Sequence, residues 1–240
     1  MISFVIPAHN EERLIGRTLG ALHAAVRAVD EPYEIIVVDD ASTDATAALA
    51  ASHGALVVKV QRRHIAAARN AGAQHARGDV LIFVDADTCV TDAVVRAAIA
   101  AIGDGAIGGG ARTRFDGRVP AYGRALMQLW LWLQPLARYA SGCFLFCTRQ
   151  AFDAAGRFDE TIYAAEDVAI SRRLKRVGGF VILRESVVTS GRNLRAHSGF
   201  DALRMLAAWL RHGPPFLKSR RGLGWWYGGR RDDPDSRRDA

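Results

Sequence analysis

Cysteine is scarce in this chain of 240 residues, and its three cysteines match neither a disulfide framework nor a zinc site. An odd number of cysteines cannot complete a set of paired disulfides. Cys143 and Cys147 lack the second pair of cysteines or histidines that a zinc site needs, and Cys89 stands apart from them. We therefore expect three reduced, buried thiols, which excludes the disulfide-stapled class of small secreted domains.

Long apolar runs are also missing. The longest, residues 125–137, is interrupted by Gln128, Gln134 and Pro135 and is shorter than the roughly 20 residues that cross a bilayer as a helix. Met1 leads directly into the apolar residues 2–6 with no basic segment before them, which predicts a strand and not a signal peptide. We expect a soluble, cytoplasmic protein.

Acidic residues are outnumbered by basic ones, 25 to 32, so the formal net charge is +7. Part of the excess lies at the C-terminal end, in Lys218, Arg220, Arg221, Arg230, Arg231, Arg237 and Arg238. We expect residues 218–240 to form a basic, flexible segment after a folded unit of residues 1–217. Because basic and aromatic residues are not interleaved over most of the chain, we expect no nucleic-acid partner.

Short β-branched runs alternate with helical patterns through the first hundred residues, which is typical of parallel βαβ units. The expected strands are residues 2–6, 34–38, 55–60 and 80–84. The expected helices are residues 11–29, 42–52, 65–77 and 92–102. Nearly continuous apolar strands indicate a sheet that is covered on both faces, so the fold class is α/β.

The pattern loosens after residue 102, where we expect a smaller region that forms the other wall of a cleft. Strands are expected at residues 108–115, 144–148, 180–183 and 187–189, and helices at residues 166–177 and 200–211. The tryptophan-rich residues 120–139 lie between them. Their apolar spacing favours core packing, with a sugar-stacking or membrane-facing surface as the alternatives.

Polar residues follow three of the four early strands, at residues 7–11, 39–44 and 85–87. Ligands of open α/β sheets bind outside the carboxyl ends of the strands, so folding brings these segments to one functional edge. Asp85 and Asp87 are suited to share one hard cation such as Mg²⁺ or Mn²⁺ with a diphosphate. The alternative is that these carboxylates cap a turn.

Taken together and in order, these segments resemble the family 2 nucleotide-sugar glycosyltransferases of the GT-A fold. The resemblance rests on Phe4 to Glu11, Glu34 to Asp44, Ala68 to Gly72, Gly78 to Asp87, Gly142 to Phe158 and the pair Glu166-Asp167. It implies an α/β/α sandwich with a mostly parallel central sheet and a smaller mixed subregion on the acceptor side. Residues 1–217 would then be one catalytic domain, with residues 1–102 binding the nucleotide sugar and residues 103–217 binding the acceptor.

The resemblance also implies which residues bind the donor. Pro7, His9 and Glu11 would line the nucleotide pocket, and Asp40 would accept a hydrogen bond from a uracil or guanine ring, so the donor would be UDP-linked or GDP-linked. His64 would lie near the diphosphate. Arg69 would either touch the donor phosphates or hold the loop of Asp85 and Asp87.

Two acidic pairs carry the implied chemistry. Asp87 would be the direct ligand of a divalent metal ion, Mn²⁺ or Mg²⁺, and Asp85 would meet the ribose or a metal-bound water. Asp167 would be the general base that deprotonates the acceptor hydroxyl in an inverting reaction, with Glu166 as its orienting neighbour. Arg192, after the last strand, would contact the diphosphate.

The implied acceptor is the hydroxyl group of a saccharide or a glycolipid precursor. The main alternative is a polyprenyl phosphate at the membrane surface. The basic amphipathic pattern of residues 203–211 predicts either a helix that rests on anionic headgroups or an ordinary helix with solvated charges. A protein that binds nucleotide sugars without catalysis is a further alternative. A dinucleotide-dependent oxidoreductase is excluded, because no Gly-x-Gly-x-x-Gly turn follows the first strand.

Overall fold

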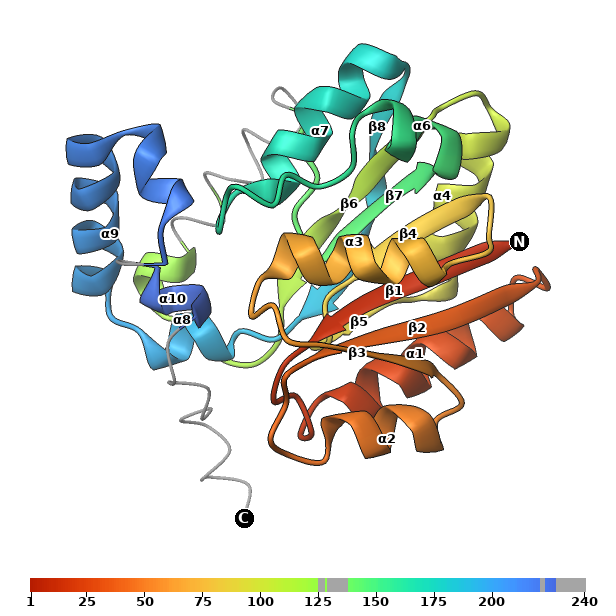
Figure 1. Cartoon of the computed structure of the whole chain (residues 1–240), viewed down its shortest axis with the longest axis horizontal. Helices are drawn as coiled ribbons and strands as arrows, with labels where there is room; N and C mark the ends of the chain where they lie inside the picture. Colours follow the sequence, from red (N-terminus) through yellow and green to blue (C-terminus); the bar gives the residue numbers. More distant parts are fainter. Residues whose placement is uncertain (125–127, 129–137, 221–222, 228–240) are drawn as a thin grey trace.

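The computed structural model describes residues 1–124, 128, 138–220 and 223–227, and Figure 1 shows one central sheet with helices on both faces. The strands are β1 (Ile2–Ala8), β2 (Tyr33–Asp40), β3 (Leu56–Val60), β4 (Val80–Val84), β5 (Thr88–Cys89), β6 (Gly108–Phe115), β7 (Phe144–Thr148) and β8 (Phe180–Thr189). The helices are α1 (Ile15–Arg27), α2 (Thr46–Ser52), α3 (Ile65–His75), α4 (Asp92–Gly103), α6 (Arg149–Ala154), α7 (Glu166–Val177), α8 (Arg192–Ala196), α9 (Gly199–His212), the 3₁₀ helix η1 (Pro214–Lys218) and α10 (Gly224–Tyr227). The α/β class expected from the sequence is confirmed.

The eight strands lie in the order β3-β2-β1-β4-β7-β6-β8-β5. Strands β1 to β4 are mutually parallel, as the βαβ pattern predicts. Strand β7 runs antiparallel to β4 and β6, whereas β6 and β8 are parallel to each other. The second half of the chain therefore extends the parallel sheet with a mixed region, so that one continuous sheet underlies both walls of the site.

Two apolar layers bury the faces of this sheet. Phe4 and Ile6 of β1 point into the layer formed with α1 and α4, while the intervening Val5 points into the layer formed with α3, α6 and α7. This alternation follows from the period of two along a strand. Both layers contain fully buried aromatic rings, which explains why the central strands are apolar on both faces.

Several element boundaries differ from the sequence-based expectations. Helix α1 begins at Ile15 and not at residue 11, because the Glu11 carbonyl accepts from the Leu14 and Ile15 amides in a turn. The two expected strand pieces after residue 180 are one strand, β8, with a register shift against β6 between Gly110 and Arg112. The short elements β5, α6 and α8 were not predicted, since none of them is long enough to show a period in the sequence.

The flexibility expected of the segment from residue 218 stays a prediction, and its described residues 223–227 make packing contacts. Leu223 is buried beside Phe216 and Ala164, and the Tyr227 hydroxyl donates to the Tyr163 carbonyl at 3.0 Å. These contacts pack α10 against the turn before α7. The remainder of that segment, together with the apolar run at residues 125–127 and 129–137, lies outside the described residues.

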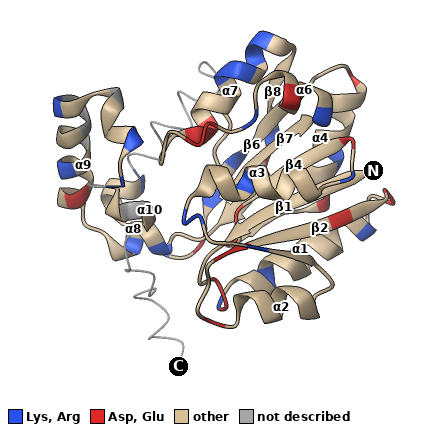
Figure 2. Cartoon of the chain, in the orientation of Figure 1, with Lys and Arg blue, Asp and Glu red and all other residues tan. Residues whose placement is uncertain are grey.

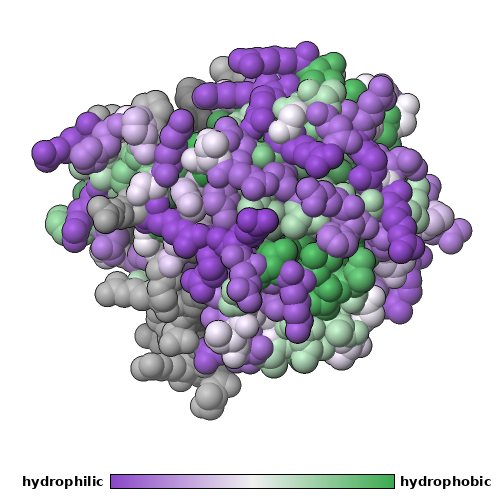
Figure 3. All heavy atoms as spheres, in the orientation of Figure 1, coloured by the Kyte–Doolittle hydropathy of each residue, from purple (hydrophilic) through white to green (hydrophobic). Residues whose placement is uncertain are grey.

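No helix within the described ranges has the length and apolar character needed to cross a membrane. Figure 3 shows an apolar surface, in green, at the position of β3, which is an edge strand of the sheet. Leu56 there is 47% exposed, and a groove of about 470 Å³ lies between β3 and α3. The groove lining contains none of the site residues that the sequence predicts.

Helix α3 lies unusually close to the sheet because Gly72 faces it. A Cβ atom at Gly72 would lie 2.8 Å from Cγ2 of Val38 and closer still to Cγ1 of Val5, both of which are fully buried. We expect Gly72→Ala to lower the free energy of unfolding by about 1–3 kcal/mol, since the helix must move away from the strands. Chemical denaturation followed by circular dichroism measures the change.

The matched control is Gly20→Ala, because a Cβ atom at Gly20 in α1 would meet nothing within 4 Å. That variant should be neutral or more stable by up to about 1 kcal/mol, as alanine is the better helix former. Equal stability changes in the two variants would contradict the close packing of α3.

Candidate functional site

The candidate site lies where the carboxyl ends of β1, β2 and β4 meet, as the strand pattern predicts. Asp85 and Asp87 follow β4 directly. The other residues of the site arrive from distant segments: Arg69 from α3, Glu166 and Asp167 from the first turn of α7, and Arg192 from α8. Figure 2 shows the acidic start of α7 and the basic residues of α8 at this end of the sheet.

The buried guanidinium of Arg69 joins the two halves of the site. Its Nη2 lies 2.8 Å from Oδ1 of Asp85 and donates to the Gly142 carbonyl at 2.9 Å, while its Nη1 lies 2.7 Å from Oε1 of Glu166. The Arg69 side chain is only 2% exposed. Of the two roles considered for Arg69, the structure supports the one that holds the Asp85 loop, and adds the tie to Glu166.

Asp167 lies beside this cluster without a direct ion pair to Arg69. Partial burial, with the nearby charge of Glu166, raises the pKa of Asp167 to about 6, although Arg69 opposes the shift. Its Oδ1 accepts from the Val168 amide at 2.7 Å, and Ala165 before the helix has a positive φ of 61°. A carboxylate with a pKa near 6 is ionised at neutral pH and basic enough to accept a proton.

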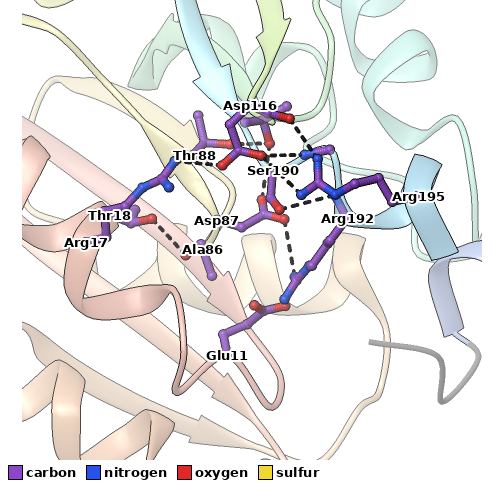
Figure 4. Close-up of polar contacts among 12 residues, drawn as sticks. Glu11, Arg17, Thr18, Ala86, Asp87, Thr88, Asp116, Ser190, Arg192 and Arg195 are labelled. Atoms are coloured by element: carbon purple, nitrogen blue, oxygen red, sulfur yellow. Dashed lines mark hydrogen bonds and ion pairs between the residues drawn. The ribbon is translucent and has the colours of Figure 1, made fainter. Parts of the chain in front are cut away.

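A second arginine, Arg192, lies between the carboxylates of Glu11 and Asp87. Nη2 of Arg192 lies 2.5 Å from Oε1 of Glu11 and 3.2 Å from Oδ2 of Asp87, as Figure 4 shows. The Thr189 hydroxyl also donates to Oδ1 of Asp87 at 3.2 Å. Burial raises the pKa of Asp87, and Arg192 counteracts this by favouring the charged form. Glu11 therefore contacts Arg192, and this ion pair was not predicted from the sequence.

The oxygen donors of Asp85 and Asp87 suit a divalent cation only in part. Within the described ranges no cluster of three or more His, Cys, Asp or Glu side chains is arranged to hold a metal ion. Mg²⁺ and similar ions commonly bind one or two carboxylates and take their other ligands from substrate phosphates and water. The two carboxylates therefore fit a cation that arrives with a diphosphate. Burial raises the pKa of Asp85 to about 7, despite Arg69, and a bound cation would favour its charged form.

The nucleotide side of the site is more strongly organised by the backbone than expected. Asp40 is buried, and its carboxylate accepts from the amides of Arg62, Arg63 and His64 at 2.6–2.8 Å. These bonds use most of its acceptor positions, so its contact with a base stays a prediction. Nδ1 of His9 lies 2.8 Å from the Asp40 carbonyl. Pro7, near the end of β1, is partly exposed.

His64 makes structural contacts that the sequence did not predict, and its position near a diphosphate stays a prediction. It is buried, and its Nδ1 caps α3 by accepting from the Ala67 amide at 3.3 Å. Its ring packs against Tyr163 with the centroids 4.4 Å apart. Burial lowers the pKa of His64, so the ring is neutral at pH 7 and is poorly suited to attract phosphate.

Sequence reasoning missed two residues that support Asp87 and Arg192, namely Asp116, which follows β6, and Thr189 at the end of β8. Oδ1 of Asp116 accepts from the Gly191 amide at 2.9 Å, and Arg195 donates to the Asp116 carbonyl at 2.8 Å. The rule that identified Asp85 also applies to Asp116, which directly follows β6 at the same edge of the sheet. The parallel pairing of β6 with β8 could not be foreseen.

Similarity to characterised proteins covers part of the chain. The chain is 35% identical over 107 residues to validoxylamine A glucosyltransferase of Streptomyces hygroscopicus subsp. limoneus, covering 42% of this chain and 23% of that protein. It is 44% identical over 97 residues to undecaprenyl-phosphate 4-deoxy-4-formamido-L-arabinose transferase of Pectobacterium carotovorum, covering 36% of this chain and 28% of that protein. The chain thus spans about a quarter of the length of these relatives.

Solved structures share the fold. The mannosyltransferase PcManGT from Pyrobaculum calidifontis, in complex with GDP-Man and Mn²⁺, matches with a TM-score of 0.64 and 20% identity, covering 94% of this chain and 69% of that one. S. aureus TarS in complex with UDP-GlcNAc also matches with a TM-score of 0.64, at 19% identity, covering 86% of this chain and 65% of that one. The GT-A fold is therefore confirmed. The sequence model of glycosyl transferase family 2 matches residues 3–158, and the chain belongs to this family of glycosyltransferases.

Proposed function

We propose that this glycosyltransferase moves a sugar from a UDP-linked or GDP-linked donor to an acceptor hydroxyl, with inversion of configuration and Asp167 as the general base. One observation carries the proposal: the buried guanidinium of Arg69 contacts both Asp85, which follows β4, and Glu166, at the start of α7. Asp167, the proposed base, directly follows Glu166 in the chain, which supports a site shared with the proposed donor ligands. A single displacement from the face opposite the leaving group inverts the anomeric centre.

The proposed donor half comprises Asp85, Asp87, Glu11 and Arg192. Two structural neighbours support a nucleotide sugar with a divalent cation, because their crystals contain GDP-Man with Mn²⁺ and UDP with Mn²⁺. Asp87 and Asp85 would hold the cation, which when bound offsets the negative charge that develops on the diphosphate. Arg192 would exchange part of its pairing with Glu11 and Asp87 for the diphosphate oxygens.

The proposed acceptor half is built on α7. Asp167 accepts the proton of the acceptor hydroxyl while the oxygen of that hydroxyl forms a bond to the anomeric carbon. The bond between that carbon and the diphosphate breaks in the same step, and the electron pair leaves with the nucleoside diphosphate. Glu166, held by Arg69 at 2.7 Å, fixes the first turn of α7 and therefore the direction of the base.

A polyprenyl phosphate is the second candidate acceptor, and two observations favour it. Curated relatives that are 36–44% identical over about 95 residues are undecaprenyl-phosphate sugar transferases. Helix α9 also exposes Phe200 (67%) and Leu203 (64%) beside the exposed Arg204 and Arg211. Such a basic, partly apolar face suits the headgroups of an anionic membrane.

Replacement of the proposed base separates the two acceptor classes. We expect Asp167→Asn to lower kcat by about 10²–10⁴-fold with a hydroxyl acceptor, because the variant cannot take up the proton. With a phosphate acceptor, which is already ionised, the loss should stay within a few-fold. Rates of nucleoside diphosphate release, measured with a saccharide and with a polyprenyl phosphate acceptor, provide the test.

The control is Asp104→Asn, which alters an exposed carboxylate after α4 and should keep the full rate. For the unaltered chain, kcat/KM should fall as the pH is lowered through 6, since Asp167 must be ionised and its pKa is about 6. A rate that stays constant down to pH 5, or full activity of Asp167→Asn with a hydroxyl acceptor, would contradict the assignment. Binding of a nucleotide sugar without turnover of either acceptor would favour the noncatalytic alternative.

Membrane contact through α9 is tested with vesicles. We expect the chain to sediment with phosphatidylglycerol vesicles but not with phosphatidylcholine vesicles, and the variant Phe200→Ser/Leu203→Ser to bind about tenfold or more weakly. Leu56→Ser is the control, because Leu56 is exposed on β3, an edge strand of the sheet that lies apart from α9. Equal sedimentation of the α9 variant and the unaltered chain would exclude this surface.

A further inference from the structure

A further acidic residue, Asp116, organises the end of β6 and is not among the residues proposed above to bind donor or acceptor. The Asp116 amide donates to the Thr189 carbonyl at 2.9 Å. Its Oδ1 accepts from the Gly191 amide at 2.9 Å, and its Oδ2 pairs with Nη2 of Arg17 at 3.0 Å. Figure 4 shows Asp116 between Arg17 of α1 and Arg195 of α8, so one carboxylate connects three separate segments.

Arg195 is packed closely between the turn after β6 and the segment before α8. Its Nη1 donates to the Asp116 carbonyl at 2.8 Å, and its side chain is 8% exposed. A Cβ atom at Gly191 would lie 2.7 Å from that same carbonyl oxygen, and one at Gly117 would lie 2.6 Å from Nη1 of Arg195. Gly117 also has a φ of +64°. Two glycines therefore allow the turn after β6 and the segment before α8 to close around the guanidinium.

The segment fixed in this way carries Arg192. Helix α8 has only five residues, too few to be stable by itself, so its position depends on its anchors. Gly191, held by Asp116, immediately precedes Arg192, and the Ser190 amide donates to the Asp87 carbonyl at 3.2 Å. The anchor at Asp116 thus sets where the Arg192 guanidinium meets Glu11 and Asp87.

We propose that Asp116 is a positioning residue for Arg192 and that it determines how tightly the chain binds the diphosphate of its donor. A long side chain that is already held in place loses less conformational entropy when it binds a ligand. No contact joins the Asp116 carboxylate to Asp85 or Asp87 among the described side chains, so its influence on the diphosphate runs through the 190–195 segment. The inference rests on the proposed function, because it requires a nucleoside diphosphate as ligand.

The test compares binding of a nucleoside diphosphate with binding of the corresponding nucleoside, by calorimetry in the presence of Mn²⁺. UDP with uridine and GDP with guanosine are the probes. We expect Asp116→Ala to weaken diphosphate binding about tenfold and to leave nucleoside binding within about twofold, because only the phosphates reach Arg192. Arg192→Ala should show the same selective loss, and the double variant should bind no more weakly than Arg192→Ala alone.

Two further variants test the same contact in case Asp116→Ala does not fold. Asp116→Asn keeps an acceptor for the Gly191 amide but loses its charge, and Gly191→Ala keeps every charge while crowding the turn; both should lose diphosphate affinity selectively. Asp92→Ala, which removes one partner of an exposed pair with Arg96 in α4, is the control. Equal loss of nucleoside and diphosphate binding, or losses that add in the double variant, would overturn the inference. Failure of the unaltered chain to bind either diphosphate would instead overturn the proposed function.

Discussion

The interaction on which the site depends is the burial of one guanidinium, that of Arg69, between carboxylates from two parts of the chain. A buried arginine without partners would be strongly destabilising, so Asp85 and Glu166 must stay near it. These contacts hold the loop after β4 against the first turn of α7, about 80 residues later in the sequence. The distance between the donor ligands and the proposed base is therefore set by an ion-pair network and not by loop length.

Arg192 forms a second set of ion pairs, with Asp87 and Glu11. Each of the two carboxylates after β4 has its own arginine, which opposes the rise in carboxyl pKa that burial causes. Arg69 is nearly inaccessible and contacts two carboxylates, whereas Arg192 belongs to a helix of five residues. A negatively charged ligand would thus change the partners of Arg192 while Arg69 remains in place.

Much of the fold and part of the site were predictable from the sequence. The four parallel strands are long and apolar enough for their pattern to identify them, and the acids after β4 follow from the rule for strand ends. The capping role of His64, the backbone bonds of Asp40 and the partners of Asp116 were not predictable. These depend on which loops meet after folding, and the pairing of β6 with β8 joins residues about 70 positions apart. Local sequence patterns do not predict contacts between such distant residues.

The central claim is that the carboxylates after β4 bind a nucleoside diphosphate together with a divalent cation. The most direct measurement is the melting temperature of the chain with UDP, GDP, dTDP or CDP, each with and without Mn²⁺, because a ligand that binds only the folded state raises it by mass action. The account predicts a rise with UDP or GDP that requires Mn²⁺ and is absent in Asp87→Ala. A chain whose melting temperature is unchanged by every nucleotide, or whose rise is the same in Asp87→Ala, would contradict it.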